Sequence, residues 1–298
     1  MPLKDWLTAL VVIMAWGVNF VVIKLALTEI PPMLLGGMRF TLVAIPAIFF
    51  IPKPALPWRI IVLYGATISL GQFTFLFTAM YQGMPAGLAS LVLQSQAFFT
   101  VLIAAVLLGE PIRRQNVIGV TLAGCGLALI HQAAAPGSVP LVGLLLTLLA
   151  AFSWSCGNIV VKVAGKTDML KLVIWGAMVP PIPFYLLSWQ IEGWPVISHS
   201  LRHIGWVGIL TLLYLAVVAT TLGFVLWGRL LNRHPVSKVA PLSLLVPVVG
   251  LVSAALLLGE KLVWLQWLGG LVVLLGLAIN TFGLSLRGWR RSSVAAQR

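Results

Sequence analysis

Ten runs of apolar residues follow one another along the chain, and each is close to the length of a membrane-spanning helix. A helix needs about 20 predominantly apolar residues to cross the hydrocarbon core of a bilayer. Short stretches rich in Pro, Gly or charge separate the runs, such as PKPALP at 52–57. We therefore predict an all-α membrane protein with ten transmembrane helices. The predicted spans are 6–26, 32–51, 60–81, 85–108, 115–131, 140–162, 171–190, 205–230, 236–258 and 264–285.

The composition favours a membrane protein over any soluble class. Hydrophobic residues make up 60% of the 298 residues and charged residues only 8%, and the mean hydropathy is +1.07. The net charge of +13 would also suit a nucleic-acid-binding protein. Such proteins collect Lys and Arg on one solvated face, whereas here these residues stand between the apolar runs. The expected partner is the lipid bilayer, and no nucleic acid is expected.

The chain contains one sequence pattern twice. LLGE occurs at 107–110 and again at 257–260, and WGVNFVVIK at 16–24 resembles WSCGNIVVK at 154–162. Each copy therefore holds five predicted helices, and because five is odd the second copy enters the bilayer from the opposite side. The prediction is an inverted five-plus-five repeat. Its parts are a first five-helix repeat at 1–131, a second at 140–285 and a basic cytoplasmic tail at 286–298.

Inverted repeats indicate a transporter. Two similar bundles related by an axis in the membrane plane enclose a site near the midplane, and rocking one bundle against the other exposes that site to each side in turn. This is alternating access. A channel or a membrane enzyme can use the same symmetry, so the residues inside the spans have to distinguish these classes.

The basic residues are distributed unevenly between the two sides of the predicted bundle. With the N-terminus in the cytoplasm, 15 of the 19 Lys and Arg residues fall on the cytoplasmic side. Three, Lys24, Arg202 and Lys261, fall on the opposite side, and Arg39 lies inside a span. Positively charged residues are enriched in cytoplasmic loops. Both termini of this multi-pass protein are therefore expected in the cytoplasm.

Several segments carry a resemblance to a known family. Through them the chain resembles the EamA-type family of the drug/metabolite transporter superfamily, over nearly its whole length. Within that superfamily it is similar to exporters of cysteine and O-acetylserine and, more distantly, of aromatic amino acids. The resemblance implies efflux of amino acids or related metabolites across the bacterial inner membrane, through a central cavity lined by both repeats. The segments are WGVNFVVIK (16–24), RFTLVAIPAIFF (39–50), GMPAGLASLVLQSQAFFT (83–100), FSWSCGNIVVK (152–162) and VAPLSLLVPVVGLVSAALLLGE (239–260).

Acidic residues and histidines stand at the ends of the predicted spans or in loops. Proton-coupled carriers usually place carboxylates or histidines inside the membrane as a relay. We therefore expect facilitated movement of the substrate down its own gradient, without ATP. The residues concerned are Asp5, Glu29, Glu110, Asp168, Glu192 and Glu260, with His131, His199, His203 and His234.

Neutral polar residues gather inside certain predicted spans. They occur at helical spacing with one another or with Trp, so each group shares one helix face. A few amide side chains can satisfy both charged groups of a zwitterion, and Trp faces add apolar contact and attract an ammonium. Each residue taken singly can instead join helices by hydrogen bonds. The candidate substrate-binding residues are Trp16, Asn19, Ser69, Gln72, Ser90, Gln94, Phe98, Trp154 and Asn158.

Three further residues are candidates for gating or structural roles. Arg39 lies about two turns from the outer end of its span, where it can extend to the interface or pair with Glu29; the alternative is a gate or a contact with a substrate carboxylate. Pro241 and Pro247 stand where the ninth span is expected to bend, at positions where the fourth span has no proline. Each proline can also be a tolerated kink.

Sequence motifs that would indicate an enzyme are weak or absent. AGKT at 164–167 resembles part of a phosphate-binding loop, but that motif requires Gly where Val160 stands. No metal-ligand cluster, no cofactor motif and no nucleophile with a base and an acid is visible in the sequence. We therefore expect no enzyme activity. The alternatives left open are a membrane-embedded transferase acting on lipids, a channel, and an exporter of another small metabolite or drug.

Overall fold

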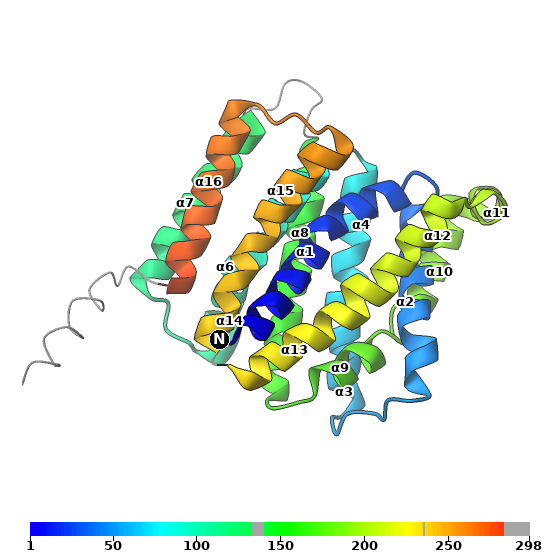
Figure 1. Ribbon diagram of the computed structural model, residues 1–298, viewed down its shortest axis with the longest axis horizontal. Coiled ribbons are helices and arrows are strands. Elements are labelled where there is room, and N and C mark those ends of the chain that lie inside the picture. The colour runs from blue at the N-terminus through cyan, green and yellow to red at the C-terminus, as the bar shows by residue number, and fades with distance from the viewer. Residues whose placement is uncertain (133–139, 235, 283–298) are drawn as a thin grey trace, which may run out of the picture.

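The computed structural model describes residues 1–132, 140–234 and 236–282, and the tail predicted at 286–298 lies outside them (Figure 1). The described residues form helices and connecting turns without a β-strand, so the predicted all-α class is confirmed for them. Five segments are 3-10 or π helices that continue or join α-helices. In chain order the elements are α1 (Leu3–Ala26), α2 (Pro32–Ile48), α3 (Trp58–Tyr64), η1 (Gly65–Gly71), α4 (Gln72–Tyr81), α5 (Ala86–Val92), η2 (Leu93–Ser95), α6 (Gln96–Leu108), α7 (Arg114–Gln132), α8 (Leu141–Ala164), α9 (Met169–Gly176), α10 (Pro181–Leu187), η3 (Ser188–Glu192), α11 (Gly193–His203), α12 (Trp206–Leu213), η4 (Tyr214–Leu222), α13 (Gly223–Arg233), α14 (Val236–Val239), η5 (Ala240–Leu244), α15 (Leu245–Leu258) and α16 (Trp264–Phe282).

Long apolar helices cover the parts of the chain where spans are predicted. In the described residues, seven helices or strings of helices are long and apolar enough to cross a membrane, and three shorter apolar helices accompany them. The seven are Leu3–Ala26, Trp58–Tyr81, Ala86–Leu108, Leu141–Ala164, Met169–His203, Trp206–Leu231 and Trp264–Phe282, and the shorter three are Pro32–Ile48, Arg114–Ile130 and Leu242–Leu258.

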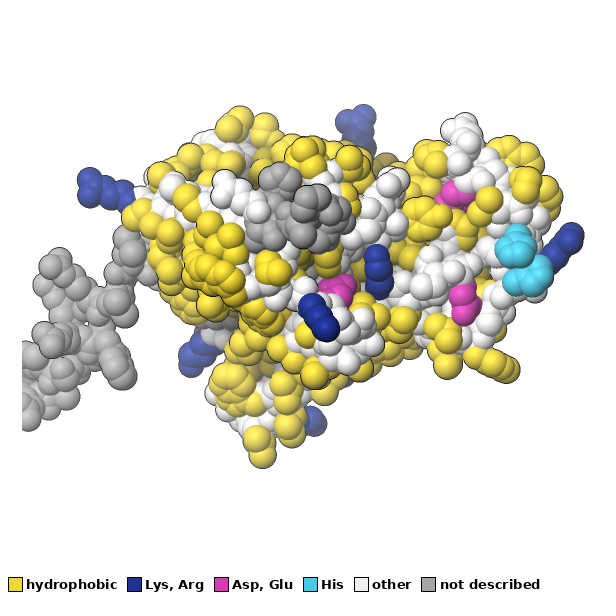
Figure 2. All heavy atoms as spheres, turned by 90° about the horizontal axis from the view of Figure 1, so that it is seen from above, with side chains coloured by type: hydrophobic (Ala, Val, Ile, Leu, Met, Phe, Trp, Pro, Cys, Tyr) yellow, Lys and Arg dark blue, Asp and Glu magenta, His cyan; other side chains and the backbone are white. Residues whose placement is uncertain are grey.

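The outer surface exposes more large apolar side chains than is usual for a water-soluble protein. Large side chains such as Phe50, Val106 and Trp206 are between 78% and 86% exposed. Figure 2 shows apolar side chains over much of the face seen from above, with Lys and Arg both at its margins and near its middle. Soluble proteins rarely expose apolar surface of this extent, whereas lipid covers it favourably. The chain is therefore a multi-pass membrane protein.

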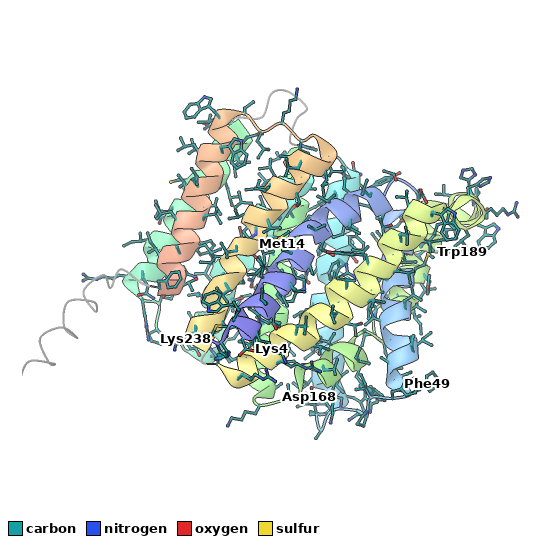
Figure 3. All side chains as sticks on the ribbon, viewed as in Figure 1. Lys4, Met14, Phe49, Asp168, Trp189 and Lys238 are labelled. Atoms are coloured by element: carbon teal, nitrogen blue, oxygen red, sulfur yellow. The ribbon has the colours of Figure 1, made fainter. Side chains whose placement is uncertain are left out.

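The segment after the seventh predicted span is helical. Between the seventh and eighth predicted spans, η3 and α11 form most of residues 190–204. Trp189 and Trp194 are more than half exposed, and their ring centres are 5.9 Å apart. Figure 3 shows Trp189 at the periphery of the bundle. Exposed Trp side chains favour the interface between lipid and water, so this segment fits the membrane surface.

Helices α7 and α16 pack side by side through glycines (Figure 1). A Cβ atom on Gly126 would lie 2.6 Å from the carbonyl oxygen of Gly269, and one on Gly276 would lie 2.6 Å from that of Gly119. Only glycine allows this approach of two backbones. The two helices therefore pack in close contact, and the pair stands at one edge of the fold in Figure 1.

Two π-helical segments face the middle of the bundle. η1 lies between α3 and α4, and η4 lies between α12 and α13. A π turn is wider than an α turn and is frequently found at functional sites. In this chain η1 carries Ser69 and η4 carries Thr220, and both residues line the central cavity.

A central polar cavity as the candidate functional site

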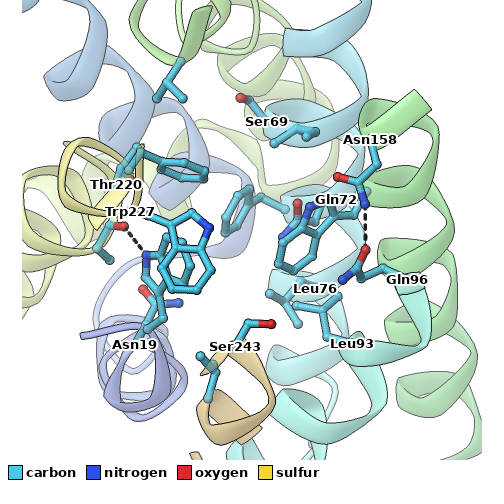
Figure 4. A pocket seen from close by; sticks show the side chains of 18 of the residues that line it. Asn19, Ser69, Gln72, Leu76, Leu93, Gln96, Asn158, Thr220, Trp227 and Ser243 are labelled. Atoms are coloured by element: carbon cyan, nitrogen blue, oxygen red, sulfur yellow. Dashed lines mark hydrogen bonds between the residues drawn. The ribbon is translucent and has the colours of Figure 1, made fainter. Parts of the chain in front are cut away.

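A cavity of about 430 Å³ lies in the middle of the helix bundle (Figure 4). This volume suits a small molecule. Both halves of the chain contribute to its wall. Its polar residues are Asn19, Arg39, Ser69, Gln72, Ser90, Gln94, Gln96, Asn158, Thr220 and Ser243, and its aromatic residues are Trp16, Phe20, Phe40, Tyr64, Phe73, Trp154, Phe224 and Trp227.

The structure brings together most of the candidates chosen from the sequence. Eight of the nine candidate substrate-binding residues line the cavity, and they come from α1, η1, α4, α5, η2 and α8. Their shared location supports the helix-face argument on which they were selected. The eight are Trp16, Asn19, Ser69, Gln72, Ser90, Gln94, Trp154 and Asn158.

Phe98 is the exception, and its predicted place in the cavity needs correction. It is 5% exposed and packs with Ala123 and Leu277, away from the cavity wall. In a continuous α-helix Phe98 would follow Gln94 on the same face. The 3-10 turn η2 instead advances three residues by ~120° each rather than ~100°, which rotates Phe98 by roughly 60°. Phe98 therefore joins the scaffold of α7 and α16.

One wall of the cavity is fixed by an amide network. Asn158 Nδ2 donates to Gln96 Oε1 over 2.7 Å and to Thr100 Oγ1 over 3.1 Å. Figure 4 shows Asn158 and Gln96 together on the wall opposite Thr220 and Trp227. These bonds join α8 to α6, and each of the two Asn158 N–H groups donates to one of the partners. The network therefore fixes the position of the Asn158 side-chain oxygen, which remains available as a hydrogen-bond acceptor.

The opposite wall is built around tryptophan. Trp16 Nε1 donates to the carbonyl oxygen of Ala219 over 2.9 Å, which ties α1 to η4. The Trp16 ring centre lies 5.3 Å from that of Trp227 and 5.5 Å from that of Phe224. Because the indole N–H is satisfied by a backbone carbonyl, the rings present apolar and π surface to a ligand.

Arg39 lies at the cavity and away from Glu29. It is 3% exposed, and its Nε and Nη2 donate to Thr220 Oγ1 over 3.3 and 2.9 Å. Glu29 instead accepts from the backbone N–H groups of Gly205 and Gly208 at the start of α12. The interpretations of Arg39 as an interface-seeking side chain or a partner of Glu29 are therefore wrong. The cavity contains a fixed positive charge.

The two prolines lie where the ninth span changes helix type. Pro241 lies in η5, and Pro247 is buried in α15. A proline cannot donate to an α-helical hydrogen bond, which favours a break. The matching position of the first half, η2, is also a 3-10 helix and has no proline. The change of helix type is thus a shared feature of both segments rather than an effect of proline alone.

Sequence reasoning missed several wall residues. Gln96 is two positions after Gln94 in an apolar run, and that polar residue was a visible signal. Thr220 stands in a Thr pair in the middle of a span, and its importance depends on Arg39, which the sequence does not reveal. Trp227 offered no signal beyond its type. All three line the cavity.

Comparison with known proteins identifies the family. The model of the EamA-like transporter family matches residues 4–132 and 141–282. The chain belongs to this family. Both matched segments contribute residues to the wall of the cavity.

Curated relatives are similar over almost the whole chain. The chain is 50% identical over 297 residues to a protein of Escherichia coli (strain K12) named "Probable amino-acid metabolite efflux pump", covering 98% of each chain. It is 49% identical to a protein of the same name from Salmonella typhimurium, covering 98% of this chain and 100% of the relative. A Bacillus subtilis protein named "Uncharacterized transporter YvbV" is 31% identical over 90% of this chain and 88% of its own.

A solved crystal structure has the same fold as this EamA-like chain. The two match with a TM-score of 0.62 over 94% of this chain and 96% of the other, at 21% sequence identity. This likeness concerns the arrangement of the helices alone.

Proposed function

We propose that this EamA-like transporter exports amino acids or their close derivatives from the cytoplasm across the inner membrane, by alternating access. The observation that carries the proposal is the central cavity, which combines amide side chains, one guanidinium and several aromatic rings. Such a wall can replace the water around a zwitterion. The names of the relatives from E. coli and S. typhimurium support the same substrate class.

The alternating-access part of the proposal rests on a ten-helix inverted repeat. Equivalent residues of the two halves have matching local geometry: Gly109 and Gly259 end their helices at φ 67° and 66°. Likewise Asn116 Oδ1 accepts from the N–H of Arg113, and Gln266 Oε1 accepts from that of Val263. In Figure 1 the link between α6 and α7 lies at the lower edge and the link between α15 and α16 at the upper edge, as an inverted relationship requires.

We place both termini in the cytoplasm. The excess of Lys and Arg on that side supports this orientation. Figure 3 shows Lys4 and Lys238 together at the lower end of the view, with Asp168 nearby. The cavity wall includes Val161, Met169 and Leu231, which are close to the ends of α8, α9 and α13 on this same side. A substrate would enter from the cytoplasm through that end.

Transport in this proposal is facilitated, and the chain is not an enzyme. Among the described residues, those that line the cavity include no Asp, Glu or His that would relay protons. A lipid-processing transferase would need such groups at the membrane face. A channel would conduct far faster than a carrier turns over. An imposed pH gradient that alone drives accumulation of an amino acid in proteoliposomes would contradict the facilitated mechanism.

Counterflow in proteoliposomes tests the proposed function. Purified protein is reconstituted into vesicles, and the vesicles are loaded with one unlabelled amino acid of a panel at a time. Uptake of the same amino acid in labelled form is then followed. We expect transient accumulation for a subset of the panel. Asn158→Ala, which removes the amide network from the wall, should lower it several-fold, while Lys166→Ala in an exposed loop should not. A flat response across the panel would reject amino acids as substrates.

A further inference from the structure

Arg39 is a buried cation with unused donors. It is 3% exposed, and its guanidinium lies 4.2 Å from the centre of the Phe73 ring. A guanidinium has five N–H groups, and Thr220 Oγ1 accepts from two of them, on Nε and Nη2. The Nη1 atom has no hydrogen-bond partner. Arg39, a residue of the cavity wall, therefore keeps three N–H groups that Thr220 does not use, on the two nitrogens that form the end of the fork.

None of the Asp and Glu side chains pairs with this cation. It has six Asp and Glu residues, and the structure describes all of them. Each is engaged elsewhere, with backbone N–H groups at a helix start or with other basic side chains. Helix starts hold Glu29, Glu192, Glu260 and Asp168, and basic side chains hold Asp5 and Glu110. A buried charge without a counter-ion is costly, and inside a membrane such a residue marks a substrate path.

An unsatisfied acceptor lies on the same cavity. Asn19 is 9% exposed, and its Oδ1 has no hydrogen-bond partner. Trp16 precedes it by one helical turn, and Trp16 and Trp227 present their rings to the same space. An amide oxygen accepts a hydrogen bond from an ammonium, and a Trp face attracts its charge. The cavity wall thus includes a cation with unpaired N–H groups and a neutral acceptor without a partner.

We propose that Arg39 binds the carboxylate of the transported substrate and that Asn19 accepts a hydrogen bond from its ammonium. This assignment rests on the proposed amino-acid export and identifies the atoms that recognise the zwitterion. The end of a guanidinium fork matches the two oxygens of a carboxylate. Thr220 acts as a positioning residue, because its hydroxyl donates to the carbonyl oxygen of Leu215 over 2.8 Å and directs its lone pairs towards Arg39.

Two sets of matched ligands test the assignment on the purified full-length protein. The first set is L-serine, L-serinamide, ethanolamine and 3-hydroxypropionate; the second is L-phenylalanine, its carboxamide, phenethylamine and 3-phenylpropionate. Ligand-induced thermal stabilisation and competition in counterflow are measured for each. With the wild type we expect the carboxamide and the amine to bind on the order of tenfold more weakly than the amino acid, because a charge-assisted hydrogen bond is lost.

Variants of Arg39 separate recognition from packing. Arg39→Gln should bind the amino acid and its carboxamide equally, whereas Arg39→Lys should keep part of the preference through its charge. Arg59→Gln removes the same charge at an exposed site and should leave the preference unchanged. If Arg39→Gln does not fold, Thr220→Val, which releases the guanidinium from its acceptor, should lower the preference for the carboxylate.

The possible outcomes separate this assignment from the proposed function. Exchange of amino acids and carboxamides alike by the wild type would overturn the role of Arg39 and leave amino-acid export standing. Binding of the des-amino carboxylates without any amino acid would keep the role of Arg39 but overturn both the role of Asn19 and amino-acid export. A carboxylate preference that persists in Arg39→Gln, or no binding of any carboxylate, would overturn the assignment.

Discussion

The carboxylate of Glu260 binds the first turn of the helix that begins at Ala86. Its two oxygens accept from the backbone N–H groups of Ala86 over 2.7 Å and of Gly87 over 3.0 Å. These residues are 174 positions apart, in different halves of the chain. The start of a helix carries a partial positive charge and unpaired N–H groups. Glu260 therefore fastens the end of α15 to α5 at one side of the bundle.

Replacing Glu260 should destabilise this EamA-like transporter. Glu260→Ala removes two charge-assisted hydrogen bonds and is expected to cost about 1–3 kcal/mol of unfolding free energy. Its counterpart Glu110 pairs with Lys162 at a site where both side chains are nearly half exposed, so Glu110→Ala should cost less than about 1 kcal/mol. Thermal unfolding of the purified proteins in detergent compares the two. Equal losses would contradict the capping role of Glu260.

Glycines at the crossing of α7 and α16 should tolerate no side chain. Gly126→Ala places a Cβ 2.6 Å from the carbonyl oxygen of Gly269, so the helices must separate. We expect a lower melting temperature and less folded protein. Gly124→Ala is the matched control, because nothing lies within 4 Å of a Cβ at that position. Size-exclusion chromatography and thermal unfolding measure both variants, and equal behaviour of the two would reject the close packing.

The end of α13 is held to α1 by Asp5. His234 Nε2 lies 2.7 Å from Asp5 Oδ2, and Arg233 Nη1 donates to Oδ1 over 3.3 Å. The Arg233 side chain is 60% exposed, whereas that of His234 is 16% exposed. Water screens the first contact more, so Arg233→Ala should cost less than about 1 kcal/mol and His234→Ala more. Thermal unfolding gives the order, and the reverse order would contradict this explanation.

Chemical labelling tests the proposed orientation. In a background with Cys125 and Cys156 replaced by Ala, Lys166→Cys and Arg202→Cys introduce single thiols at exposed positions. A membrane-impermeant maleimide applied to intact cells should label Arg202→Cys, and should label Lys166→Cys only after the membrane is opened. Labelling of both thiols from the same side would refute the proposed crossing of the membrane between residues 166 and 202.

The fold was largely predictable because one strong force dominates it. Runs of apolar residues near 20 in length admit few alternatives in a bilayer, so α1 and α8 appear where the sequence predicts helices. The place of Arg39 was not predictable, because it depends on which partner Glu29 takes. Glu29 has two suitable N–H groups, on Gly205 and Gly208, more than 170 residues away, and pairings at that distance leave no local pattern.

The candidate site was predictable where the helices are regular. Asn19 and Asn158 lie on uninterrupted α-helices, and spacing relative to Trp identified their faces. Phe98 follows a 3-10 turn that changes the rotation of the chain, so spacing failed there. Gln96 and Thr220 also lie next to or within irregular helix segments. Hydropathy does not reveal such segments, since a π or 3-10 turn has the same composition as an α turn.

The π-helical turns of η4 have a consequence for how this cavity can change. A π turn accommodates an additional residue compared with an α turn, so shortening the segment by one residue would produce an unbroken, narrower helix of the same hydropathy. That shorter protein would still insert in the membrane, but the hydroxyl of Thr220 would turn away from the guanidinium it holds. Small insertions and deletions in this segment would therefore remodel ligand preference while sparing membrane insertion.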